Sequence, residues 1–171
     1  MGKKPCENEC SLVIDGMSIR KDSSWDKNSW KFVGHVDFGG TMEESDKIAT
    51  EALVFMAVGL SGRWKMPVAY FFTDHASAEI QTNLVLDCIR RLHVAGITVR
   101  AVTCDGTEVN LSMFRRLGVD MDKPYFNHPS NSEVKIFGVC DACHMLKLVR
   151  NTLGDLKILR DQNNEPIRWH I

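Results

Sequence analysis

The sequence has no apolar stretch near the ~20 residues of a membrane-spanning helix, and no apolar signal-peptide core follows its first residues. It also has little net charge, because 21 Lys and Arg face 22 Asp and Glu, which gives −1 at pH 7. A free-standing nucleic-acid-binding domain usually has a basic excess, so DNA contact here would need a local patch or another domain. Internal repeats and low-complexity segments are missing as well. We expect one globular unit with no membrane segment.

The sequence has six cysteines and no secretion signal, so we expect reduced intracellular thiols rather than disulfides. Two pairs have spacings found in zinc sites: Cys6 with Cys10, and Cys140 with Cys143 followed by His144. These pairs need not converge in space, and buried free thiols are common. A zinc site is therefore only the weaker alternative.

Apolar runs and helical periodicity divide the chain into alternating elements. The predicted strands are 11–20, 30–38, 52–60, 67–73, 97–104 and 133–140, with a final hairpin from 156–160 and 167–171. Helices are predicted over 77–95, over 109–117, and from the N-cap Asp141 to about Leu153, closed by Gly154; 120–132 is predicted as a loop. Antiparallel strands come first and helix–strand crossovers follow, which predicts an α/β fold with a mixed sheet.

Two aspartates stand at or near the ends of apolar, β-branched runs: Asp15 in LVIDGM and Asp105 in VRAVTCDG. A carboxylate in a buried strand needs something to compensate its charge. The helix over 77–95 is the kind of crossover that places the strand 97–104 parallel beside the strand 11–20. Both acids would then face one point, where a divalent cation with oxygen ligands would bind. The alternative is that each is a turn or strand-end residue, and Asp105 an N-cap.

The chain resembles the P-element and THAP-type DNA transposases in six strings that occur in order. They are residues 14–20, 32–37, 52–56, 67–73, 101–106 and 141–151. The resemblance implies an RNase H-like mixed sheet with flanking helices, incomplete at the C-terminus, from a domain that cleaves and joins DNA strands with two Mg²⁺ (or Mn²⁺) ions. It makes Asp15 and Asp105 the first two acids of an Asp-Asp-Glu triad. Asp141-x-x-His144 resembles an accessory motif near the active site, although Asp141 is also a good N-cap. Asn110 is interpreted as local structure.

In this family the third acid, a Glu, follows an inserted GTP-binding domain, and the present sequence has no candidate for it. The resemblance thus implies a loose lead-in over 1–10, the N-terminal portion of an RNase H-like domain over 11–155, and a hairpin over 156–171 leading toward the insertion. GTP would bind only in a full-length relative. DNA partners, a nuclear location and homo-oligomers are expected from the family. We predict little activity from these residues alone; the alternative is a non-catalytic, domesticated remnant acting as an interaction module.

Overall fold

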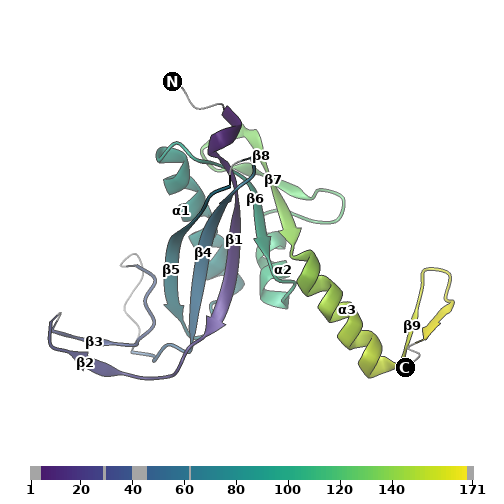
Figure 1. Cartoon of the computed structure of the whole chain (residues 1–171), viewed down its shortest axis with the longest axis horizontal. Helices are drawn as coiled ribbons and strands as arrows, with labels where there is room; N and C mark the ends of the chain where they lie inside the picture. Colours follow the sequence, from purple (N-terminus) through teal and green to yellow (C-terminus); the bar gives the residue numbers. More distant parts are fainter. Residues whose placement is uncertain (1–4, 29, 40–45, 62, 169–171) are drawn as a thin grey trace.

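The protein is described from a computed structural model, which defines residues 5–28, 30–39, 46–61 and 63–168 (Figure 1). The helices are a 3-10 turn η1 (Pro5–Asn8), α1 (Ala78–Val94), α2 (Glu108–Arg116) and α3 (Ala142–Leu156). The strands are β1 (Glu9–Ser18), β2 (Ser24–Asp26), β3 (Lys31–Val33), β4 (Glu51–Gly59), β5 (Lys65–Thr73), β6 (Thr98–Cys104), β7 (Tyr125–His128), β8 (Asn131–Cys140), β9 (Ile158–Arg160) and β10 (Pro166–Arg168).

Six strands form the central sheet, in the order β5-β4-β1-β6-β8-β7. β1, β4 and β5 pair antiparallel, whereas β1, β6 and β8 run parallel and β7 returns antiparallel to β8. Helix α1 connects β5 to β6 and α2 lies between β6 and β7, as expected for crossovers. The predicted α/β mixed sheet is confirmed.

One face of the sheet forms the core with α1 and α2 (Figure 1). Alternation along β1 buries Cys10, Leu12 and Ile14 on this face, as the two-residue period of a strand requires. Helix α1 contributes an apolar stripe: Leu84, Val85, Cys88, Ile89 and Leu92. Its first turn is capped by Ser77, whose Oγ accepts a hydrogen bond from the Ile80 amide at 3.3 Å.

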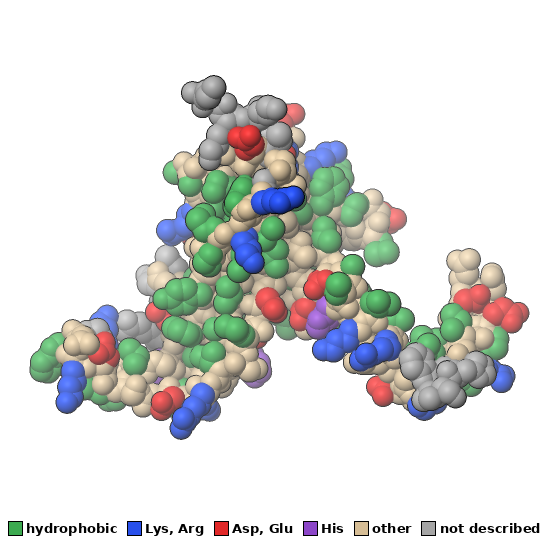
Figure 2. Space-filling model, viewed as in Figure 1, with side chains coloured by type: hydrophobic (Ala, Val, Ile, Leu, Met, Phe, Trp, Pro, Cys, Tyr) green, Lys and Arg blue, Asp and Glu red, His purple; other side chains and the backbone are tan. Residues whose placement is uncertain are grey.

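The opposite face of the sheet, which we call the open face, leaves large apolar side chains in water. By strand register it presents Met17, Tyr70, Phe137 and Val139, which are 57%, 68%, 46% and 43% exposed. Figure 2 shows apolar side chains along the sheet. None of the described helices is long and apolar enough to cross a membrane.

Three sequence expectations about single elements are wrong. The strand expected over 30–38 is only Lys31–Val33, because the backbone turns at Gly34 with φ 97°, and its partner is the short strand β2. The segment 120–132, expected to be a loop, contains β7. Gly154 lies within α3 instead of closing it; the helix ends at the left-handed Lys157, whose φ is 63°.

Candidate functional site

Asp15 lies near the carboxyl end of β1 and its side chain is exposed. Residues of β1 with odd numbers point to the open face, because the even-numbered Leu12 and Ile14 are in the core. Ser11 shows the same alternation: its Oγ is 2.9 Å from the Thr103 Oγ1 on neighbouring β6. Asp15 therefore projects from the open face, at the edge where the parallel strands end.

Asp105 follows directly after the last residue of β6 and is half-buried. Its Oδ1 accepts hydrogen bonds from the backbone N of Thr107 at 3.2 Å and from Asn110 Nδ2 at 2.5 Å. Asn110, which is 9% exposed, also donates to the Asp105 backbone oxygen at 3.2 Å. Asp105 therefore has the turn-forming role that was considered as the alternative, and these hydrogen bonds hold one of its carboxylate oxygens in place.

The pairing of β1 with β6 is the element of the site that the sequence predicted, and it is confirmed. The strands are parallel, with Val13 opposite Thr103, so Asp15 and Asp105 each stand two residues farther along. The Glu9–Arg100 ion pair, 2.6 Å between Oε1 and Nη2, secures the other end of this strand pair. Neighbouring strands lie ~4.8 Å apart, so the two acids occupy adjacent positions at one sheet edge. Their role as metal ligands stays a prediction.

Helix α3 begins beside Asp105. The Asp141 amide donates to the Cys104 backbone oxygen at 2.8 Å, and the Asp141 carboxylate accepts from the Cys143 amide at 2.9 Å, so Asp141 is the N-cap predicted for it. A side chain at Gly106 would collide with Met145 Sδ at 2.5 Å, so α3 approaches the Asp105 loop closely because residue 106 is glycine. His144, in the first turn of α3, is half-buried.

Acidic side chains gather where the sheet ends and α3 begins, with basic side chains farther along the helix (Figure 2). No group of three or more His, Cys, Asp or Glu able to hold a metal occurs among the described residues. In the part of the chain that the structure describes, Asp15 and Asp105 therefore have no third such side chain grouped with them.

Sequence reasoning did not single out Glu51, the first residue of β4, at the same end of the sheet. Its Oε2 accepts a hydrogen bond from the buried Thr73 hydroxyl at 3.1 Å, and its side chain fills the space beside Gly16. Gly16 is an even-numbered residue of β1, so Glu51 lies toward the core face, away from Asp15. The only sequence signal was its place directly before an apolar run.

The zinc alternative gains no support from the described residues. Cys10 is the second residue of β1 whereas Cys140 is the last of β8, and these strands run the same way, so the cysteines lie at opposite ends of the sheet. Burial raises the pKa of the Cys10 thiol to about 11, which opposes thiolate formation. The side chain of Cys6 lies outside the described residues.

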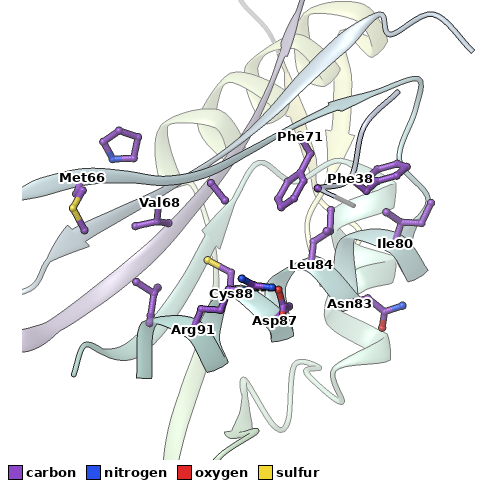
Figure 3. A pocket seen from close by; sticks show the side chains of 14 residues that line it. Phe38, Met66, Val68, Phe71, Ile80, Asn83, Leu84, Asp87, Cys88 and Arg91 are labelled. Carbon is purple, nitrogen blue, oxygen red and sulfur yellow. Dashed lines mark hydrogen bonds and ion pairs between the residues drawn. The ribbon is translucent and has the colours of Figure 1, made fainter. Parts of the chain in front are cut away.

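A pocket of 740 Å³ lies between β5 and α1, remote from both acids (Figure 3). Its walls are mostly apolar, with Phe38, Val68 and Leu84 among them, and Cys88 points into it. Asp87 and Arg91 form a 2.7 Å ion pair on its helical side. Neither Asp15 nor Asp105 lines it, so it offers no substrate pocket for these acids.

The sequence is similar to two known domain families and to two transposases. The family described as "TNP-like, RNase H N-terminal domain" matches residues 2–118, and "TNP-like, GTP-binding insertion domain" matches residues 143–171. The human DNA transposase THAP9 is 37% identical over 88% of this chain, and the Drosophila melanogaster transposable element P transposase is 34% identical over 90%. The chain spans only 17% and 18% of these two relatives.

Among solved structures, the Drosophila P element transposase strand transfer complex matches the fold with a TM-score of 0.78 at 24% identity. The match covers 98% of this chain and 34% of that one. The six-stranded mixed sheet is therefore RNase H-like. With two thirds of its residues matched by the family, the chain belongs to the P-element-type transposases and includes the N-terminal part of their RNase H-like domain.

Proposed function

We propose that this chain supplies the first two metal-binding carboxylates, Asp15 and Asp105, of a transposase catalytic core that cleaves and joins DNA strands. The observation that supports this most directly is the parallel pairing of β1 with β6, since it brings both residues to one edge of the sheet. The relatives at 37% and 34% identity are named as transposases, which supports DNA as the substrate.

The residues fit a hard divalent cation. Asp15 is exposed, and Asp105 has one oxygen engaged by Asn110 and Thr107, which leaves its second oxygen for a ligand. Carboxylate oxygens are the ligands that Mg²⁺ and Mn²⁺ prefer. Such ions, when bound, activate water or a 3′-hydroxyl and neutralise charge on a phosphodiester. Asn110 would act as a positioning residue, and the Asp141 N-cap would anchor α3 beside the site.

The remaining ligands, including a third carboxylate, are proposed to come from outside these 171 residues. GTP is proposed to bind only where the full insertion domain is present. We propose a junction near residue 155, with 11–155 RNase H-like and 156–171 leading to the insertion. The insertion-domain match starts at 143, so α3 spans this junction. A nuclear location and assembly into oligomers are further proposals from the family.

A thermal-denaturation titration of the chain with Mn²⁺, Ca²⁺ and Mg²⁺ tests the metal site. A ligand that binds only the folded state at ten times its Kd stabilises by about 1.4 kcal/mol. For a chain of this size that raises Tm by roughly 3–6 °C. We expect this rise in the unaltered chain and its loss in Asp15→Asn and in Asp105→Asn.

Asp120→Asn is the matched control, because Asp120 is an exposed turn aspartate whose Oδ1 accepts from the Lys123 amide at 2.7 Å, away from the strand ends. It should keep the full rise. An equal rise in all three variants, or none in the unaltered chain, would contradict the metal site. The exposed apolar residues of the open face would then favour the interaction module.

A further inference from the structure

A two-stranded hairpin formed by β2 and β3 leaves the sheet at the edge where Asp15 lies. β1 ends at Ser18, and the Ile19 amide still bonds the Thr50 backbone oxygen at 3.0 Å before the chain departs. The hairpin then projects well beyond the sheet, on the side away from α3 (Figure 1). Its position is set by the same strand that carries the first acid.

Three aromatic side chains of this hairpin, which we call the aromatic cluster, are Trp25, Trp30 and Phe32. They are 47%, 77% and 62% exposed. Trp25 meets Trp30 edge-on at 6.3 Å and Phe32 at 5.1 Å between ring centroids. These contacts hold the rings together, yet each of the three residues keeps about half or more of its surface in water. Packing within the hairpin therefore does not account for them, and exposed apolar clusters mark interaction sites.

Basic residues alternate with the aromatic cluster. Arg20, Lys21, Lys27 and Lys31 are all exposed, and against Asp22 and Asp26 they leave residues 20–35 with a formal charge of +2 (4 − 2), whereas the whole chain is −1. Surfaces that bind single-stranded nucleic acids combine these two features: aromatic rings stack on bases and cations contact phosphates. A charge of +2 is small for duplex binding, which depends mainly on phosphate contacts.

We propose that the β2–β3 hairpin, which extends from the end of the sheet where Asp15 lies, binds single-stranded DNA, with Trp30 and Phe32 stacking on unpaired bases and Lys27 and Lys31 contacting phosphates. This rests on the proposed function, because the single strand would come from DNA cleaved at the proposed acids. A base can stack on the open faces of these rings only if it is not paired within a duplex. If the hairpin bound a protein instead, it would have no affinity for single-stranded DNA.

Fluorescence anisotropy with a labelled 20-nucleotide single strand tests the proposal. Trp30→Ala and Phe32→Ala should each weaken binding about 5- to 150-fold, the range for loss of one stacked base. Trp30→Tyr should retain most affinity. Lys27→Ala and Lys31→Ala should each reduce the slope of log affinity against log salt by about 0.7. Phe137→Ala, which removes a half-exposed ring of the open face on β8, is the control and should bind as the unaltered chain does.

A second measurement needs no variant. The same 20-mer with abasic positions keeps the phosphates but has no bases, so it should bind weakly and leave tryptophan fluorescence unquenched. Equal binding of normal and abasic strands, undiminished binding by the Trp30 and Phe32 variants, or absence of binding at micromolar protein would overturn the proposal. Binding that depends on the rings but not on the lysines or on salt would overturn the proposed phosphate contacts.

The metal titration separates this inference from the proposed function. Trp30→Ala should keep the Mn²⁺-induced rise in Tm, and Asp15→Asn should keep single-strand affinity. A rise in Tm with Mn²⁺ but no hairpin-dependent DNA binding would contradict the hairpin proposal alone. Hairpin-dependent DNA binding with no rise in Tm on adding Mn²⁺ would contradict the metal site alone.

Discussion

Asn110 holds Asp105 by two hydrogen bonds from one amide, at 2.5 Å to Oδ1 and 3.2 Å to the backbone oxygen. We predict that Asn110→Ala weakens Mn²⁺ binding about 10- to 100-fold, the usual cost of removing a partner of a metal ligand. Isothermal titration of the chain measures it. Asn131→Ala, which removes an exposed side-chain amide at the start of β8 that accepts from the Glu133 amide, should leave affinity unchanged. Equal losses in both variants would show that Asn110 does not act through Asp105.

His128 is a second residue whose surroundings predict a measurable effect, which is a dependence of stability on pH. It is 3% exposed, and its Nδ1 accepts from the Ser130 amide at 3.0 Å, so the proton of the neutral ring is on Nε2. Among the described residues Nε2 has no hydrogen-bond partner. Burial lowers the pKa of His128 from 6.5, and His93 of α1, with ring centroids 4.8 Å apart, and Arg100 of β6 lower it further. His128 therefore binds a proton less readily in the folded state than in the unfolded chain.

Because the unfolded state binds more protons below pH 6.5, the free energy of unfolding should fall as pH drops from about 7 to 5. Urea denaturation across this range measures the slope. His128→Gln, which keeps an acceptor for the Ser130 amide but does not titrate, should flatten it. The control His75→Asn changes an exposed histidine at φ 58°, a conformation asparagine tolerates, and should not alter the slope. A slope that survives His128→Gln would assign it to other groups.

At the scale of elements, two glycines should respond to Ala in opposite directions. A Cβ at Gly138 of β8 would meet Val119 Cγ1 at 2.9 Å and Phe114 at 3.1 Å, so Gly138→Ala overpacks the contact with α2 and should cost about 1–3 kcal/mol. Gly154 lies inside α3 with nothing within 4 Å, so Gly154→Ala should stabilise the helix by up to about 1 kcal/mol. Chemical denaturation of both variants measures the difference. Destabilisation by Gly154→Ala would mean that residue 154 terminates the helix.

Strands and helices differed in how well the sequence predicted them. β4, β5, β6 and α1 followed from uninterrupted apolar runs or a 3.6-residue period, which are local signals. β2, β3 and β7 have only three or four residues, and each exists because a partner strand supplies its hydrogen bonds. Strands this short have too few residues to show a period, although β9 and β10, also of three residues, lie where the final hairpin was predicted.

At the scale of the whole molecule, the activity of the chain should follow from the proposal that it holds only the first two of three catalytic acids. With only two of the proposed ligands, these 171 residues should nick supercoiled plasmid in Mn²⁺ no faster than their Asp15→Asn variant. A longer protein that adds the downstream sequence should nick faster, and Asp15→Asn in it should reduce nicking to background. Gel electrophoresis of plasmid forms gives the readout. Robust nicking by the short chain that is lost in Asp15→Asn would show that its own residues complete the site.

The sequence by itself determined the α/β class, the crossover that sets β6 beside β1, and the two acids at their ends, since buried runs and an isolated carboxylate after each run are readable without coordinates. Only the tertiary structure decided that Asn110 fixes Asp105, that Glu51 turns away from Asp15, and that the rings of the hairpin remain in water. The physical reason is that the sequence shows which residues alternate between the two faces of a strand, but helices distant in the sequence determine which face becomes buried. The partners of a carboxylate likewise depend on which groups the folded chain brings within hydrogen-bonding distance.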